Sequence, residues 1–341
     1  VDNHAAITTR VAPSFLRVGQ LELFARRVRG NSHDNALSEL KIIVQHLIDR
    51  NYRNDIDPSH SFNEKVIKLA YLYRERLVSL VANWMRVGYC QGNFNSDNCA
   101  AGGFTLDYGP FGFCELFDPR FQPWTGGGEH FSFFNQPFAA EINFKMFCSS
   151  LLPLLLENNE DIEKLEKIKN DFSKFMSKEM QLMWTKKLGL EKYDETLTNE
   201  LFNLMANSKA DFSIFFRKLS HIPDNISFLK DSFYLPSTED LDKKWFIWLK
   251  KWQDCIKKQG NYKEISKSMK QVNPKFTWRE WMIVPAYEEA EEGNYSKIKE
   301  LQTIFKNPYE EQSLETDQKY NRLRPREFFN KGGISHYSCS S

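Results

Sequence analysis

Two carboxylates and one amide lie close together in the sequence between positions 91 and 107: Asp97, Asn98 and Asp107. Carboxylate and amide oxygens are the ligands that Mg²⁺ prefers, and Mg²⁺ in turn binds phosphate oxygens. A carboxylate beside such a site can also accept a proton from a hydroxyl nucleophile. The alternative is an Asx-rich loop whose side chains only cap turns, an interpretation that suits Asn93 and Ser96 best.

The spacing of these residues follows the order of two protein-kinase motifs. Kinases carry H-R-D-x-x-x-x-N and then D-F-G, in which the Asn and the second Asp bind Mg²⁺. Gln91 stands at the His, Asn98 lies seven residues later, and Asp107-Tyr108-Gly109 matches D-F-G. Asn93 replaces the kinase catalytic Asp, and an amide cannot take a proton from a hydroxyl. We therefore expect Asn98 and Asp107 to hold Mg²⁺, and ordinary γ-phosphoryl transfer is not expected.

A second feature lies near the start of the chain. Arg10 and Arg17 are seven positions apart in the otherwise apolar stretch Thr9 to Gly19. Guanidinium groups in such a stretch need anionic partners, and the planar fork of arginine suits phosphate. Surface or salt-bridged arginines are the alternative that the residues alone leave open.

Helical patterns flank the polar segment on both sides. Apolar residues recur with a helical period from Asp34 to Asn51, and Ser61 with Glu64 forms a capping box that starts a helix ending near Val87-Gly88. Further helices are expected after Ala139, at 161–187, at 198–207, at 240–259, and as two helices within 273–305 with Gly293 between them. Residues 88–137, rich in Gly, Asn, Asp and Pro, are predicted to form a long functional loop system. The pattern indicates a mainly α fold with a small β element.

Composition narrows the classes of function. Lys and Arg number 46, Asp and Glu 45, and the net charge is +1, which argues against a nucleic-acid binder. No apolar run approaches the length of a membrane span. The six cysteines are scattered without a CxxC pair, so a reducing compartment fits best.

Several further strings make a family resemblance visible. They are Thr9 to Gly19, Val87 to Phe113 with its DYGPFGF, Phe134-Asn135-Gln136-Pro137, Asn273-Pro274-Lys275, Asn307-Pro308-Tyr309 and the terminal Cys-Ser-Ser. In this order and spacing they resemble the selenoprotein O family. The family usually has His-Gly where this chain has Gln91-Gly92.

The resemblance implies a protein-kinase-like fold that binds ATP in a flipped orientation and transfers AMP to Ser, Thr or Tyr of target proteins. It implies Asp97 as the proton acceptor, Asn98 and Asp107 as ligands of Mg²⁺ (Mn²⁺ as an alternative), and Asp107 also as an ATP contact. Arg10 and Arg17 would hold the terminal phosphate. The expected partners are therefore ATP and protein substrates, with no nucleic acid and no membrane span.

The resemblance also implies a division of the chain. Residues 1–30 would end or connect to the N-lobe and carry the phosphate-binding arginines. Residues 31–310 would form the kinase-like C-lobe with its metal loops at 88–137, and 311–341 a tail. The glycine-rich nucleotide loop and the N-lobe Lys are not found in this sequence. We therefore expect the N-lobe to be largely missing, and this chain alone could be inactive.

Cys339 stands where family members carry selenocysteine or cysteine, which suggests a redox role. Cys114 is the best-placed partner for a bridge, and Cys90 and Cys99 are the alternatives. The compartment expected from the resemblance is mitochondrial in a eukaryote and otherwise cytoplasmic. The rival functional hypothesis is a nucleotide-binding pseudokinase that acts through protein partners.

Overall fold

A computed structural model describes residues 7–124 and 128–329. This part of the chain is mainly helical and carries a single two-stranded sheet, which confirms the expected mainly α fold with a small β element. The chain forms two compact units, described separately here. The first unit comprises 1–80, 94–108 and 140–173, and the second comprises 81–93, 109–139 and 174–341. Three of the borders between the units fall within helices, namely α3 (Phe62–Val87), α4 (Gln136–Leu151) and α6 (Phe172–Leu188), and the other two lie outside helices, at 93/94 and 108/109.

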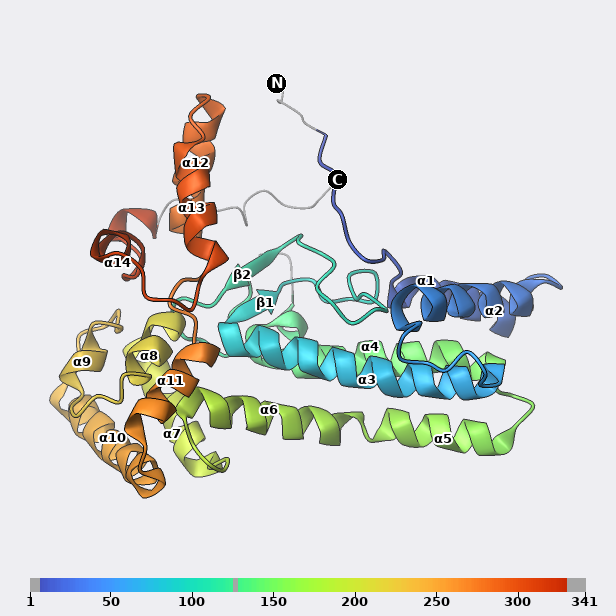
Figure 1. Ribbon diagram of the computed structural model, residues 1–341, viewed down its shortest axis with the longest axis horizontal. Helices are drawn as coiled ribbons and strands as arrows, with labels where there is room; N and C mark the ends of the chain where they lie inside the picture. Colours follow the sequence, from blue (N-terminus) through green and yellow to red (C-terminus); the bar gives the residue numbers. More distant parts are fainter. Residues whose placement is uncertain (1–6, 125–127, 330–341) are drawn as a thin grey trace. The chain divides into compact units, whose positions relative to one another are not determined.

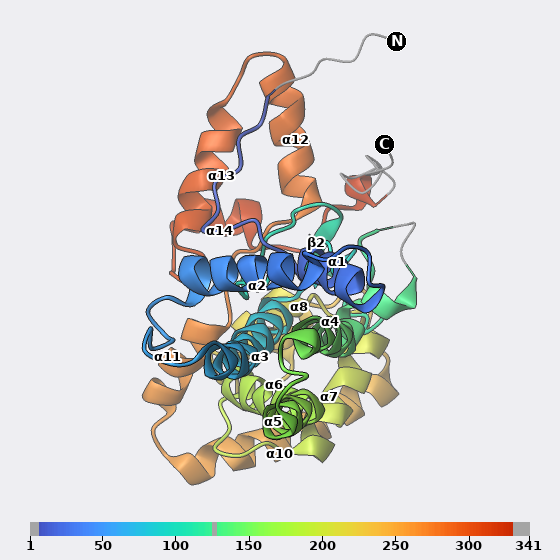
Figure 2. The same ribbon diagram turned by 90° about the vertical axis from the view of Figure 1, so that its right-hand side faces the viewer.

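The first unit is built from helices around a fully buried apolar core. Helices α1 and α2 lie side by side and contact each other (Figures 1 and 2). Its core includes Leu21, Leu40, Val44, Leu69 and Phe144, all nearly inaccessible to solvent. Its elements are α1 (Val18–Arg29), α2 (Ala36–Leu47), the π-helix η1 (Ile48–Tyr52), the first part of α3 (Phe62–Val87), the second part of α4 (Gln136–Leu151), η4 (Leu152–Leu154) and α5 (Asn159–Asn170).

Several helix boundaries follow from local chemistry. The capping box at the start of α3 is confirmed, because the Ser61 N–H donates to the Glu64 carboxylate and the Glu64 N–H donates to Ser61 Oγ. The helix expected at 34–51 is present but changes from α to π after Leu47. The single helix expected at 161–187 is two helices, α5 and α6 (Phe172–Leu188), which meet at Asp171.

The second unit combines the sheet with a helical array. Strands β1 (Tyr89–Gln91) and β2 (Phe111–Phe113) pair antiparallel, with Tyr89 opposite Phe113 and Gln91 opposite Phe111 (Figure 1). Its helical elements are the last part of α3, the first part of α4, most of α6, η2 (Glu129–Phe131), η3 (Phe133–Asn135), α7 (Glu195–Ser208), α8 (Phe212–Leu219), α9 (Ser227–Lys230), α10 (Glu239–Gln259), α11 (Tyr262–Val272), α12 (Glu280–Glu291), α13 (Ser296–Lys306), α14 (Leu314–Tyr320) and η5 (Arg326–Phe328).

Helices α12 and α13 form a hairpin, visible in Figure 2. Gly293 lies in the turn with a φ of 86°, a left-handed conformation that favours glycine, so the prediction of two helices around Gly293 is confirmed. Across the described ranges, no helix combines the length and the apolar character that crossing a membrane requires.

Buried ion pairs stabilise the second unit. Arg279 forms two hydrogen bonds to Asp211, of 2.5 and 2.9 Å, and both side chains are buried. Glu115 lies 3.6 Å from Arg279, and burial raises the pKa of this carboxyl to about 7. Lys275, also buried, bonds to Glu311 and Asp317, which fixes the segment that follows α13. Each of these charges has an opposite charge beside it, as burial requires.

Candidate active site

Three of the predicted site residues lie in one loop of the first unit, residues 94–108, which we call the metal loop. Main-chain bonds attach this loop to the beginning of α1. Arg17 pairs with Ala100 as an antiparallel bridge, and the Val18 N–H donates to the Cys99 carbonyl at 2.9 Å. The Gly19 N–H donates to the Ser96 carbonyl at 3.0 Å. The first N–H groups of a helix have no acceptor within the helix. In α1, carbonyl groups of the metal loop serve as acceptors for two of them.

Asn95 shapes the turn that carries Asp97 and Asn98. Its side-chain oxygen accepts hydrogen bonds from the Asp97 N–H at 3.0 Å and the Asn98 N–H at 3.2 Å. The buried Asn143 of α4 donates to the carbonyl of Phe94, where the loop enters this unit. Asn95 and Asn143 thus fix the turn, and the sequence analysis assigned neither of them a role.

Gly19 gives Asp97 room beside α1. A Cβ atom at Gly19 would lie 2.2 Å from Asp97 Oδ1 and 3.2 Å from Ser96 Oγ, so no larger residue fits without moving the carboxylate. Asp97 itself is exposed to solvent. A solvent-accessible carboxylate can accept a proton from a substrate that binds next to it.

Arg10 contacts the C-terminal end of the metal loop. Its guanidinium donates to the carbonyl of Leu106, the residue before Asp107, at 2.7 Å. The guanidinium also stacks over the ring of Phe15 with 5.3 Å to the centroid, and Arg10 remains exposed. Hence the two predicted phosphate-binding arginines are both attached to this loop, Arg17 near its middle at Ala100 and Arg10 near its C-terminal end at Leu106.

Arg17 holds an unsatisfied donor. Its Nε atom is buried and has no hydrogen-bond partner, while the residue as a whole is partly exposed. A buried donor without a partner costs about 1–3 kcal/mol, and such atoms occur where an anion or water completes the bonding. The free donor is compatible with an anion-binding role for Arg17, which stays a prediction.

Asn98 and Asp107, the predicted metal ligands, are both half-buried on the metal loop. Their oxygens suit Mg²⁺ in chemical type. Among the described residues, no group of three or more His, Cys, Asp or Glu could hold a metal ion. Two protein ligands fit Mg²⁺, because this ion commonly takes one or two side chains plus phosphates and water in nucleotide-dependent enzymes.

Gln91 and His130 occupy different environments in the second unit. Gln91, at the position of the kinase His, is buried, and its N–H donates to the side-chain oxygen of Gln136 at 2.9 Å. Gln136 also donates to the Tyr89 carbonyl, so it joins β1 to the start of α4. His130, in η2, is exposed and packs against Phe131.

The cysteines that were considered as redox partners are inaccessible. Cys90, Cys99 and Cys114 are free and at most 1% exposed. Burial raises the pKa of the Cys99 and Cys114 thiols to about 12, and the pKa of Cys90 also rises. Because the thiolate is the reactive form, a bridge to any of them requires local opening. Cys339 lies outside the described residues, so its redox role stays a prediction.

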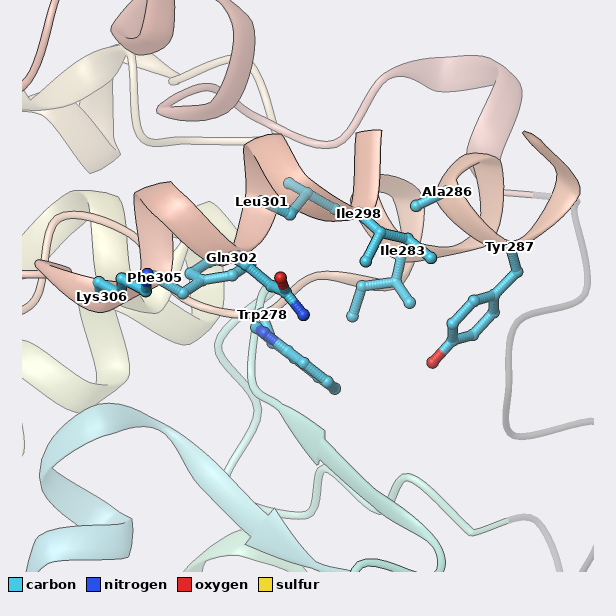
Figure 3. Close-up of a pocket in the computed structure, with 9 residues that line it drawn as sticks. All are labelled: Trp278, Ile283, Ala286, Tyr287, Ile298, Leu301, Gln302, Phe305 and Lys306. Carbon is cyan, nitrogen blue, oxygen red and sulfur yellow. The ribbon is translucent and has the colours of Figure 1, made fainter. Parts of the chain in front are cut away.

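A pocket of about 630 Å³ lies on the α12–α13 hairpin of the second unit (Figure 3). Its wall is mainly apolar and aromatic, and none of the predicted site residues lines it. The lining residues are Trp278, Ile283, Ala286, Tyr287, Ile298, Leu301, Gln302, Phe305 and Lys306.

Comparison with known proteins supplies an independent line of evidence. The family model described as protein adenylyltransferase SelO matches residues 2–306. The chain is 32% identical to the protein nucleotidyltransferase YdiU of Aromatoleum aromaticum over 98% of this chain and 63% of that protein. It is 33% identical to the YdiU of Flavobacterium johnsoniae over 98% of this chain and 64% of that protein. The chain thus spans less than two thirds of the length of these curated relatives.

Proposed function

The chain belongs to the protein adenylyltransferase SelO family, and we propose that it transfers AMP from ATP to hydroxyl groups of Ser, Thr or Tyr in target proteins. One observation carries this proposal beyond the family name. The metal loop holds an exposed carboxylate and two half-buried oxygen ligands, and an arginine with an unsatisfied donor is bonded to the same loop. These groups match the needs of nucleotidyl transfer, which are proton removal, charge neutralisation and a grip on the leaving group.

In the proposed reaction, a hydroxyl of the target protein attacks the α-phosphorus of ATP, and pyrophosphate leaves. Asp97 accepts the proton of that hydroxyl, because it is exposed and its carboxylate lies beside the α1 N-terminus. Arg17 and Arg10 bind the terminal phosphates, and their planar guanidinium groups are fitted to phosphate oxygens. The metal loop positions both arginines relative to Asp97.

Asn98 and Asp107 would hold Mg²⁺, or Mn²⁺ in its place. The metal would neutralise phosphate charge and orient the bound nucleotide. In this proposal the chain forms a kinase-like C-lobe, and Asn93 at the kinase base position disfavours transfer of the γ-phosphate.

Labelled ATP separates adenylyl transfer from its alternatives. We propose to incubate the full-length protein and a protein extract with Mg²⁺ and either α-labelled or γ-labelled ATP. Label should enter protein only from α-ATP. Asp107→Ala should abolish the labelling, and Asp97→Asn should reduce it by about 10²–10⁴-fold, the usual contribution of a general base. Both changes are at loop positions, so the free energy of unfolding should fall by only about 1 kcal/mol or less.

Three results would contradict the proposal. Transfer from γ-ATP alone would identify an ordinary kinase. ATP binding without any transfer would identify the nucleotide-binding pseudokinase that acts through partners. Full turnover of folded Asp107→Ala would show that Asp107 is structural.

A further inference from the structure

A brace between α3 and the π-helix η1 fixes the middle of the metal loop, and the residues that form it are Tyr52 and Arg76. The Tyr52 hydroxyl donates to the Ala101 carbonyl at 2.7 Å, and Tyr52 is fully buried. Arg76 donates from one nitrogen to the carbonyls of Gly102 at 3.2 Å and Asn51 at 3.0 Å. Both side chains thus bind carbonyls between Asn98 and Asp107.

Arg76 is held in place by three further contacts. Its second terminal nitrogen bonds to the Asp55 carboxylate at 2.8 Å, and its guanidinium lies 4.0 Å from the centroid of the Tyr52 ring. Gly103 has a φ of 75°, and a Cβ there would lie 2.5 Å from Arg76 Cβ. The loop backbone therefore rests directly on α3 at this residue.

The π-helix contributes the geometry of the brace. π-helices are rare, and most occur as single turns near functional sites. Here the π-turn Ile48–Tyr52 supplies two contacts to one guanidinium, the Asn51 carbonyl as a hydrogen-bond acceptor and the Tyr52 ring as a stacking partner. A lysine cannot replace this arrangement, since it lacks the planar fork that bonds two carbonyls and a carboxylate at once.

We propose that Tyr52 and Arg76 are positioning residues that set the separation of the two metal ligands, Asn98 and Asp107. This inference rests on the proposed function for its catalytic meaning. The structural part of the inference is that Tyr52 and Arg76 hold residues 99–107 in one conformation. This part depends only on the hydrogen bonds.

The test compares Arg76→Lys and Tyr52→Phe with Tyr71→Phe in the full-length protein. Tyr71 is a matched control because it lies on the same helix α3 and is partly exposed. Hydrogen exchange of peptides covering 99–107, measured without nucleotide, should be about tenfold faster in Arg76→Lys and about fivefold faster in Tyr52→Phe, the effect of losing one hydrogen bond. The control should exchange like the wild type.

A second readout links the brace to the metal. The Kd for Mn²⁺, measured with a non-hydrolysable ATP analogue, should rise about tenfold in Arg76→Lys, while analogue binding without metal stays within about twofold. Unchanged exchange in 99–107 would overturn the proposal, and so would faster exchange spread evenly over the first unit. Unchanged Mn²⁺ affinity despite faster loop exchange would overturn the positioning role. If the wild type transfers no AMP but the variants show the expected faster hydrogen exchange, the proposed function is wrong and the structural role of Tyr52 and Arg76 still holds.

Discussion

Charged side chains are used in opposite ways in the metal loop and in the α8 region of the second unit. In the metal loop Asp97 is exposed and forms no ion pair within the described residues, and Arg17, whose main chain is bonded to this loop, has a buried donor without a partner. Around α8, Asp211 and Arg279 are buried and bonded to each other twice. Paired burial serves stability, whereas unpaired or solvent-facing charge keeps its bonding capacity for a ligand. The variants below test this division, beginning with the largest expected effect.

Asp211→Ala should destabilise the protein strongly. The change leaves the Arg279 guanidinium buried without its two hydrogen bonds to Asp211, with Glu115 at 3.6 Å, and removes the cap that Asp211 provides to the Ile214 N–H. Breaking a buried pair by removing one partner costs about 3–5 kcal/mol. Urea unfolding should show this loss. Asp231→Ala is the control, because Asp231 pairs with Lys218 at the surface and its removal should cost at most about 1 kcal/mol. Equal losses of unfolding free energy in Asp211→Ala and Asp231→Ala would contradict the idea that the buried pair serves stability.

Glu115→Gln should change how stability depends on pH. Burial raises the pKa of Glu115 from 4.5 to about 7, so the folded protein binds this proton more tightly than the unfolded chain does. The contribution of protonated Glu115 to the free energy of unfolding is therefore complete below about pH 4.5, and it is lost as the pH rises through about 7. Gln cannot ionise and avoids that loss.

The measurement is the free energy of unfolding of both proteins at pH 5 and pH 8. The variant should gain on the order of 2 kcal/mol relative to the wild type between these two pH values. Parallel pH profiles would show that Arg279 compensates the Glu115 charge completely in the folded state.

Gly19→Ala should impair transfer without impairing folding. The new methyl group would lie 2.2 Å from the Asp97 carboxylate, and this exposed side chain can rotate away. We expect the rate of AMP transfer to fall about tenfold through misplacement of the base. Gly30→Ala, at the other end of α1 with a φ of −85°, is the matched control and should keep full activity. A melting temperature that falls in Gly19→Ala while the rate per folded molecule stays normal would refute the role of Asp97.

Local patterns were the part of this molecule that the sequence predicted well. The Ser61–Glu64 capping box and the turn at Gly293 depend on neighbours within a few residues, and both are confirmed. The break between α5 and α6 was missed because the charged and apolar pattern continues through Asp171. The π-turn after Leu47 was missed for a similar reason, since its apolar residues continue the helical period.

Contacts between distant residues could not be predicted in the same way. Asp97, Asn98 and Asp107 were found by motif spacing, and Arg10 and Arg17 by their setting and the family resemblance. Nothing in the sequence indicates that Gly19 makes room for Asp97, that Tyr52 bonds to a carbonyl 49 residues later, or that Arg279 pairs with Asp211 across 68 residues. These contacts depend on how distant segments pack against each other. The hydrophobic pattern along a single helix or strand does not specify that packing.

The burial of Cys99 makes this residue a natural chemical reporter on the metal loop. Its thiol lies 3.2 Å from the Tyr73 hydroxyl and directly follows Asn98 in the chain. A thiol reagent can reach Cys99 only when the metal loop opens. The rate of thiol modification would therefore report how often the loop opens. Ligands that close the loop should slow this labelling, and no engineered dye or tag would be required.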